Sequence, residues 1–230
     1  GLGDVYKRQT LFRVLLAVKR GLLAAWILLV KQGHFRSVVN GAPVAADGEP
    51  LPWFTYPAIE YLKQFDFSDM RVFEYGAGNS SLFWAARARE VVAVESDQQW
   101  FNRISAISPS NLALNMHADQ ESYVSCITRQ EDMFDVVVVD GKWRNACLEI
   151  AINCLSPEGI VIFDNSDRYA GACKSLRERG YLEIDFSGPG PINGYAWTTS
   201  VFVKHPIAIQ SRYAPAAPLG GLNEIAADED

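Results

Sequence analysis

An acidic residue and two glycines form the first candidate site, in the segment Glu74 to Ser80 with the sequence E-Y-G-A-G-N-S. Gly76 and Gly78 allow the backbone to turn tightly and to approach a ligand closely. If a helix follows the turn, its first N–H groups are free to bind the same ligand. A glycine turn that only joins a strand to a helix has the same sequence features, so this segment alone does not identify a ligand.

A second carboxylate, Glu95, closes the apolar run from Val91 to Val94, about 20 residues past the glycine turn. A carboxylate at the end of a strand can accept hydrogen bonds from both hydroxyls of a ribose. The alternative is an acidic residue at a strand end that only contacts solvent. An acidic group that closes an apolar run at this spacing favours the ribose ligand.

A third group of polar residues follows two later apolar runs. Asp140 comes after the run 134–139, and Asp164 and Asn165 come after the run 160–163. If both runs are neighbouring parallel strands, these side chains converge at the same edge of the sheet. Two carboxylates and an amide oxygen are hard ligands that suit a divalent cation such as Mg²⁺. The alternative is that Asp140 orients a cofactor or caps a helix, while Asp164 and Asn165 bind a substrate without metal.

The elements that must position these residues alternate regularly between strand and helix patterns. The clearest helical pattern is 145–155, and the run 136–139 is typical of a strand buried on both faces of a parallel sheet. This alternation predicts an α/β fold with a doubly wound, mostly parallel, seven-stranded sheet. Residues 188–194 contain Gly and Pro without a helical pattern, so the last two strands should form a C-terminal antiparallel hairpin. The expected strands are 71–75, 91–95, 112–116, 134–140, 159–164, 181–186 and 197–204.

With these motifs, the chain resembles the class I, Rossmann-like S-adenosylmethionine-dependent methyltransferases over residues 73–204. Their first motif has an acidic residue two positions before G-x-G, which matches Glu74, Gly76 and Gly78. The resemblance implies that S-adenosylmethionine is the cofactor. It further implies a set of cofactor-binding residues, with Glu95 on the ribose and Asp119 near the adenine: Glu74, Gly76, Gly78, Asn79, Ser80, Glu95 and Asp119.

Two alternatives share this fold. The first is an NAD(P)-dependent oxidoreductase, whose G-x-G-x-x-G/A fingerprint would need glycine or alanine where this chain has Ser81. A pyrophosphate also favours an electropositive loop, whereas Glu74 suits a ligand with an ammonium group. The second is a noncatalytic membrane-surface module, against which the joint presence of Glu74, Glu95, Asp140 and Asp164 argues.

The third group of residues is similar to that of the metal-dependent O-methyltransferases, which hold their ion with an Asp after the fourth strand and an Asp-Asn after the fifth. This resemblance implies that Asp140, Asp164 and Asn165 bind Mg²⁺ or another divalent cation. It also implies that Asp140 and Lys142 are catalytic, with Lys142 as general base if burial and the ion lower its pKa. The match is imperfect, because Trp143 stands where that family has its lysine.

Composition bounds the function further. The formal net charge of −6 supplies no attraction to nucleic acid, so we expect no nucleic-acid partner. We expect the enzyme to O-methylate an acceptor that is a hydroxylated small molecule or a glycan. The four cysteines form no C-x-x-C pair, which favours reduced core cysteines and a cytoplasmic protein.

Both ends of the chain need separate treatment. Residues 1–9 resemble the translation of a transposon-end sequencing adapter, and we exclude them from the fold argument. The N-terminal extension, 10–70, contains an apolar segment, 11–30, which charged residues interrupt, so it does not indicate a membrane span. Peripheral contact with a membrane surface and packing on the core are equally compatible with this segment. We expect residues 71–205 to form the methyltransferase domain and residues 206–230 to be a disordered tail.

Overall fold

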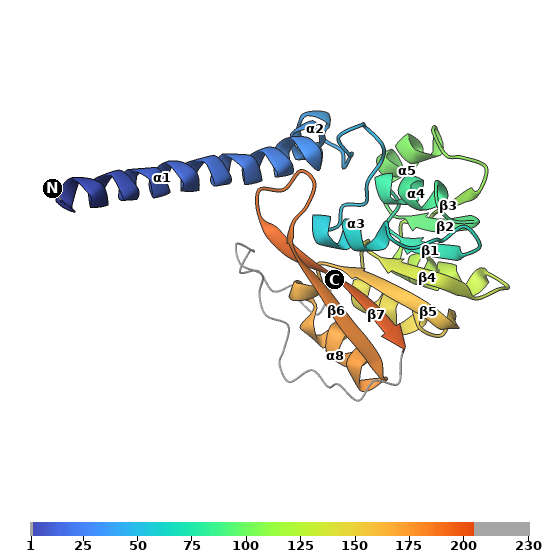
Figure 1. Cartoon of the computed structure of the whole chain (residues 1–230). Coiled ribbons are helices and arrows are strands. Elements are labelled where there is room, and N and C mark those ends of the chain that lie inside the picture. The colour runs from blue at the N-terminus through green and yellow to red at the C-terminus, as the bar shows by residue number, and fades with distance from the viewer. Residues whose placement is uncertain (1, 205–230) are drawn as a thin grey trace.

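The computed structural model describes the backbone of residues 2–204 and the side chains of residues 9–204 (Figure 1). The predicted tail, 206–230, lies outside the described residues.

A seven-stranded sheet forms the centre of the molecule, with the strand order β3-β2-β1-β4-β5-β7-β6. Strands β1 to β5 are parallel, and β7 runs antiparallel to both β5 and β6. The predicted doubly wound sheet with a C-terminal antiparallel hairpin is therefore confirmed. The strands are β1 (Arg71–Tyr75), β2 (Glu90–Glu95), β3 (Leu112–Met116), β4 (Phe134–Val139), β5 (Leu155–Asp164), β6 (Tyr181–Pro189) and β7 (Ala196–Lys204).

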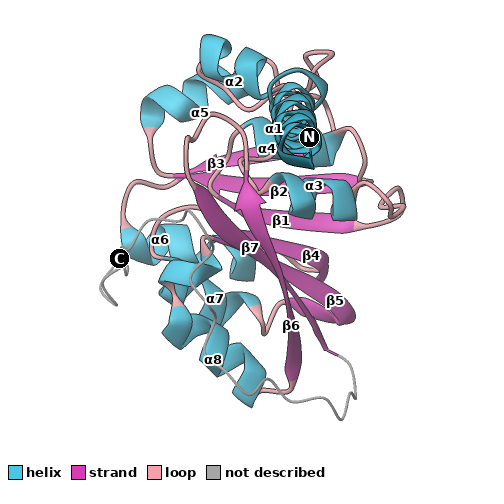
Figure 2. Cartoon of the chain, turned by 60° about the vertical axis from the view of Figure 1, so that its left-hand side comes forward, coloured by secondary structure: helices cyan, strands magenta, loops and turns pink. Residues whose placement is uncertain are grey.

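Helices cover both faces of the sheet, as Figure 2 shows, and a separate apolar core lies under each layer. Strand β4 lies at the centre, and the side chains of Val136 to Val139 are fully buried because they alternate between the two cores. One layer contains α3 (Tyr56–Leu62), α4 (Asn79–Ala85) and α5 (Gln98–Ser105). The other contains α6 (Gln120–Val124), the 3-10 turn η2 (Ser125–Arg129), α7 (Arg144–Ala151), the 3-10 turn η3 (Ser166–Arg168) and α8 (Ala170–Glu178).

The first switch in strand order lies between β1 and β4, where residues 72–75 pair with residues 136–139. Chain connections leave β1 toward one layer and β4 toward the other, so a crevice opens outside their carboxyl ends. The β6–β7 hairpin adds a second wall, because its pairing with β5 places Thr199 opposite Asp164. The fold thus brings the ends of β1, β4, β5 and β7 to one edge.

The N-terminal extension has two parts. Helix α1 (Leu2–Trp26) continues into a π-helical turn, η1 (Ile27–Lys31), and extends away from the sheet (Figure 1). Leu22 is 67% exposed, so α1 does not cover the core. After α2 (His34–Asn40), the chain returns to the sheet, and residues from Leu51 to Leu62 join the core of the α3 layer. Within the described part of the chain, every helix is too short or too polar to cross a membrane, and contact with a membrane surface stays a prediction.

Candidate active site

A cavity of about 530 Å³ lies at the carboxyl edge of the sheet, within the size range of small-molecule and cofactor sites. Its floor comes from the turns after β1, β2, β4 and β5, and its walls from the β6–β7 loop and from the segment before α3. The residues that line the cavity include Pro43, Trp53, Gly76, Gly78, Asn79, Ser80, Glu95, Trp100, Asp140, Lys142, Arg144, Asp164, Asn165, Tyr195 and Trp197.

The glycine turn after β1 lies directly against the turn after β4. Gly76 has a φ of 94°, and a Cβ there would lie 2.8 Å from the backbone of Gly141. Only glycine fits both the dihedral angle and the approach. A Cβ on Gly78 would lie 3.3 Å from Nε1 of Trp100, so the turn also contacts the helix after β2. The two glycines therefore allow the three turns to meet at one cavity.

Glu74 lies beneath this turn and does not line the cavity. Its carboxylate accepts a hydrogen bond from the Ser81 hydroxyl, and Ser81 Oγ in turn accepts one from the Gly78 N–H at 3.1 Å. The other carboxylate oxygen, Oε1, is buried without a hydrogen-bond partner among the residues described. Sequence reasoning treated Ser81 only as a missing glycine, although a hydroxyl three residues into a helix is the signal for this capping arrangement.

Burial raises the pKa of Glu74 from 4.5 to about 7, with a smaller contribution from the negative charge of Glu95. The folded protein therefore holds this proton more tightly than the unfolded chain. The contribution of this bound proton to the stability of the fold is complete below pH 4.5, the ordinary pKa. It falls as pH rises from there and is lost above pH 7, the pKa in the folded protein. Because the pKa rises by about 2.5 units, we expect this group to lower the free energy of unfolding by about 3 kcal/mol across that range.

Glu74→Gln tests this expectation, because the amide cannot ionise. Urea unfolding of the ligand-free protein between pH 5 and 8 should show a flatter pH dependence for Glu74→Gln than for the parent. Glu158→Gln, at an exposed position, should retain the parent's slope. Equal slopes for the parent and Glu74→Gln would contradict the expectation.

Glu95 ends β2 at the cavity, with 8% of the residue exposed. Its Oε1 accepts hydrogen bonds from the N–H groups of Ser96 and Asp97, at 2.7 and 2.8 Å. Within the described chain, Oε2 makes no hydrogen bond and is available to a ligand. The neighbouring Asp97 caps α5, which places the indole of Trp100 at the cavity. Sequence reasoning missed Trp100, because an aromatic residue in a helix is more often part of the core.

Asp119 is not where the resemblance implied. It is exposed, it does not line the cavity, and its Oδ1 caps α6 by accepting a hydrogen bond from the Ser122 N–H at 2.8 Å. This backbone hydrogen bond holds the pKa of Asp119 below its ordinary value. The assignment of Asp119 to the adenine is therefore wrong in this structure, since the side chain is used to begin a helix.

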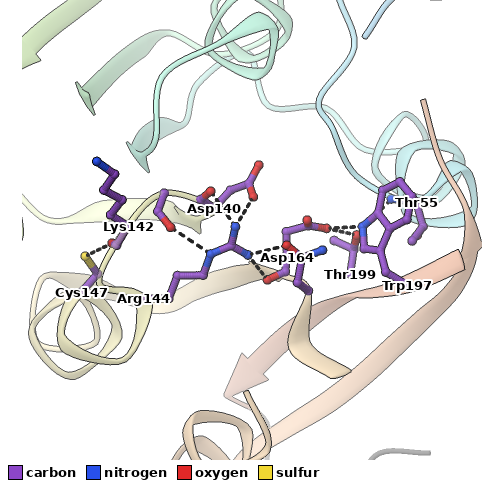
Figure 3. A network of polar contacts seen from close by, with 10 residues as sticks. Thr55, Asp140, Lys142, Arg144, Cys147, Asp164, Trp197 and Thr199 are labelled. Carbon is purple, nitrogen blue, oxygen red and sulfur yellow. Dashed lines mark hydrogen bonds and ion pairs between the residues drawn. The ribbon is translucent and has the colours of Figure 1, made fainter. Parts of the chain in front are cut away.

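Arg144, which follows Trp143 in the sequence and begins α7, connects the ends of β4 and β5 (Figure 3). Its guanidinium donates to Asp140 Oδ1 at 2.9 Å, to Asn165 Oδ1 at 3.0 Å and to the backbone oxygen of Asp164. It also donates to the backbone oxygens of Asp140 and Gly141, at 2.9 and 3.0 Å. A charged guanidinium thus lies among the three residues predicted to bind a metal.

These residues do not fit a divalent cation. Asp140 and Asn165 each use a side-chain oxygen on Arg144, and Asp164 Oδ1 accepts hydrogen bonds from Trp197 Nε1, at 3.0 Å, and from Thr199 Oγ1 (Figure 3). Among the described residues, no three His, Cys, Asp or Glu side chains are placed to hold an ion. As placed, these residues do not fit an ion, because a guanidinium and the β7 side chains take oxygens that the predicted metal site needs.

The two carboxylic acids nevertheless have unusual acidity. Burial raises the pKa of Asp140 from 3.8 to about 7, against the opposing effect of Arg144, and the charge of Glu74 adds to the rise. Burial, with the charge of Asp140, raises the pKa of Asp164 well above its ordinary value. Both groups line the cavity, and Asp140, with a pKa of about 7, can exchange a proton with a bound molecule near neutral pH.

Lys142 lines the cavity but is exposed, and in Figure 3 its side chain points away from Arg144. Its Nζ lies 5.8 Å from the ring centre of Trp143. Its role as general base depended on burial, and the side chain is exposed.

The segment before α3 closes the cavity from above. The Asn79 side chain donates a hydrogen bond to the backbone oxygen of Pro43 at 2.7 Å, which joins this segment to the glycine turn. Trp53 lines the cavity and is 39% exposed, whereas its neighbours Phe54 and Tyr56 are buried in the core. Of these three aromatic residues, Trp53 alone lines the cavity.

Comparisons with known proteins support this fold. No family model matches the chain. The chain is 34% identical over 151 residues to the ribosomal protein L11 methyltransferase of Prochlorococcus marinus (strain MIT 9301), which covers 62% of the chain and 50% of that protein. The chain thus spans half the length of this curated relative.

Among solved structures, an rRNA methylase from Streptococcus thermophilus matches with a TM-score of 0.50 and 15% identity, over 65% of this chain and 97% of that one. The N-methyltransferase NodS from Bradyrhizobium japonicum WM9, in complex with S-adenosyl-L-homocysteine, matches with a TM-score of 0.44 and 13% identity, over 62% and 81% of the two chains.

These findings also correct one expectation. The two similar methyltransferases described first are named for a ribosomal protein and for ribosomal RNA, which contradicts the prediction of a small-molecule or glycan acceptor without nucleic acid. The predicted fold, in contrast, is confirmed by the sheet order and by the similar rRNA methylase structure. The chain has the Rossmann-like fold of the class I S-adenosylmethionine-dependent methyltransferases.

Proposed function

We propose that the chain is an S-adenosylmethionine-dependent methyltransferase whose acceptor is a protein. The observation that carries the proposal is the cavity between the glycine turn, Glu95 and the paired ends of β4 and β5. It combines a close backbone approach, a carboxylate with an available oxygen, and acidic groups that can take up a proton.

The charge of the cavity favours this cofactor over a dinucleotide. At the turns after β1 and β2, Glu74 lies beneath the glycine turn and Glu95 and Asp97 line the cavity. Carboxylates at this end attract the ammonium and sulfonium groups of S-adenosylmethionine and repel the pyrophosphate of NAD(P). The unpartnered Oε1 of Glu74 supports a positively charged group above the turn.

The residues present can hold the two ends of this cofactor. Glu95 Oε2 would accept hydrogen bonds from the ribose, while Gly76, Gly78, Asn79 and Ser80 would surround the methionine end. When bound, the cofactor supplies a methyl group activated by a sulfonium. This division of roles rests on the geometry of the lining residues and on the fold.

The chain's own contribution to the reaction is orientation and proton transfer. Trp53, Tyr195 and Trp197 enclose the part of the cavity nearest β7, where they can exclude water and align an acceptor. Asp140 is the proton acceptor available to it, because its pKa of about 7 lies near neutral pH and it faces the cavity. We assign the catalytic role to Asp140, a positioning role beside it to Asp164, and Lys142 to the exposed rim of the cavity.

Two observations favour a protein acceptor. The curated relative is named for a ribosomal protein, and it shares 34% of its aligned residues with this chain. In addition, the formal net charge of −6 attracts basic polypeptides and repels RNA at long range.

Calorimetric titration with S-adenosylhomocysteine tests the cofactor, with NADPH as the competing ligand. We expect saturable binding of the former alone, and binding of NADPH instead would overturn the proposal. Transfer of a labelled methyl group from S-adenosylmethionine into ribosomal fractions tests the acceptor. Label should enter the protein fraction, and label confined to RNA would replace the protein acceptor by RNA.

The pH dependence of binding provides a second measurement. Because the pKa values of Glu74 and Asp140 are both raised to about 7, these groups bind a cation better once they ionise. S-Adenosylmethionine and S-adenosylhomocysteine share the amino acid end, so the ratio of their affinities isolates the sulfonium charge.

We expect this ratio to favour S-adenosylmethionine more strongly as pH rises from 6 to 8, by about 1 kcal/mol. Asp140→Asn should reduce the change, and Asp69→Asn, far from the cavity, should not. A ratio independent of pH in the parent protein would show that these carboxylates do not face the sulfonium.

A further inference from the structure

We propose that the guanidinium of Arg144 is the built-in cation of this site and replaces the divalent ion that the sequence led us to expect. It is a positioning residue: it holds the ends of β4 and β5 together, so that the cavity forms without metal. The effect on methyl transfer rests on the proposed function, whereas the claim about the cation does not.

The first argument is the saturation of the guanidinium. Such a group has five N–H donors. Nε donates once, and Nη1 and Nη2 donate twice each, always to an oxygen. No donor remains for a substrate, so Arg144 acts through the residues that it holds.

The second argument is the identity of the oxygens. Asp140, Asp164 and Asn165, the predicted metal ligands, supply four of the five acceptors: the side-chain oxygens of Asp140 and Asn165 and the backbone oxygens of Asp140 and Asp164. A divalent ion would have to displace a buried arginine side chain that is only 12% exposed. Unlike a bound ion, the arginine cannot dissociate, and it stays charged at every physiological pH.

The third argument is the backbone on either side. Trp143, which precedes α7, and Asn165, which follows β5, both have left-handed conformations, with φ of 52° and 55°. Such conformations cost free energy in non-glycine residues and persist where surrounding contacts hold them. Trp143 is held by an edge-on contact with Tyr123, at 5.2 Å between ring centres. Asn165 is held by its hydrogen bond to Arg144.

The first experiment measures Mn²⁺ binding by the parent protein, with paramagnetic resonance or calorimetry. We expect no specific binding and no effect of a chelator on thermal stability. Stoichiometric Mn²⁺ binding, displaced by Mg²⁺, would overturn the proposal without any reference to activity. The parent protein alone can therefore decide against it.

The second experiment removes the guanidinium. Arg144→Ala exposes the same oxygens without their cation, so we expect it to bind Mn²⁺ at least about tenfold more tightly than the parent. Ethylguanidinium should compete with Mn²⁺ in this variant and restore its affinity for S-adenosylhomocysteine. Arg179→Ala, which removes a surface pair with Glu149, should show neither effect.

If Arg144→Ala does not fold, Arg144→Lys keeps the charge with fewer donors. We expect it to fold with weakened cofactor binding and to respond to neither Mn²⁺ nor a chelator. Cofactor affinity equal to that of the parent would overturn the positioning role. If the parent protein does not bind S-adenosylhomocysteine, the proposed function is contradicted. The Mn²⁺ measurement then still decides whether Arg144 takes the place of a metal ion.

Discussion

Replacing Glu95 with alanine is expected to weaken the binding of S-adenosylhomocysteine by at least about 100-fold. Hydrogen bonds to a charged group contribute about 1.5–3 kcal/mol each, and a ribose offers two hydroxyls to this carboxylate. The loss should be large because Glu95 lies at the cavity with only 8% of the residue exposed, so water cannot easily take its place.

Alanine also removes the acceptor for the N–H groups of Ser96 and Asp97, which could loosen the turn. Glu95→Gln separates the two effects, since its amide oxygen can still accept both hydrogen bonds. We expect Gln to retain the parent's stability in urea unfolding and to bind the ligand with intermediate affinity. Glu121→Gln, exposed on α6, serves as the control for charge. Undiminished affinity in Glu95→Ala would remove Glu95 from the cofactor site.

Gly141→Ala should destabilise the protein by about 3 kcal/mol or more, although it adds only one methyl group. A Cβ at this position would lie 1.9 Å from Tyr123 Oη and 2.9 Å from the backbone nitrogen of Gly76. Tyr123 is 1% exposed and packs against Tyr75 and Trp143, so it has no space into which to move. The glycine turn must therefore shift away from β4.

Urea unfolding of Gly141→Ala and Gly194→Ala gives a matched comparison. Gly194 lies in the β6–β7 loop near the same cavity, and a Cβ there would contact no atom within 4 Å. We expect Gly194→Ala to change stability by no more than about 0.5 kcal/mol. We also expect Gly141→Ala, where folded, to lose affinity for S-adenosylhomocysteine. Similar stabilities for the two variants would show that the turns after β1 and β4 do not need their close approach.

The strands could be predicted because their pattern is local. Apolar runs such as 136–139 indicate buried strands in any compact α/β arrangement, and β1 and β3 begin and end where the sequence predicts. The helix predicted for 145–155 ends instead at Ala151, because Leu155 already pairs with Phe134 as the start of β5. Where helix and strand patterns overlap, pairing with a neighbouring strand determines the boundary.

The positions of the glycine turn and of Glu95 at the cavity could also be predicted from sequence, because they depend on the end of a strand and on backbone freedom, and their binding roles stay predictions. The assignments of Asp119 and Lys142 could not be made correctly. A carboxylate after a strand can cap a helix as readily as it binds a ligand, and exposure separates the two only in three dimensions.

The sequence by itself therefore determined the order of strands and helices and the turn at which a cofactor would bind. The tertiary structure alone decided which cation, a metal ion or an arginine side chain, lies between the ends of β4 and β5. A metal and an arginine are both compatible with two aspartates and an asparagine, since all three bind cations through oxygen. In the folded chain, Trp143 turns with a φ of 52° into α7, and the Arg144 guanidinium lies on the side-chain oxygens of Asp140 and Asn165.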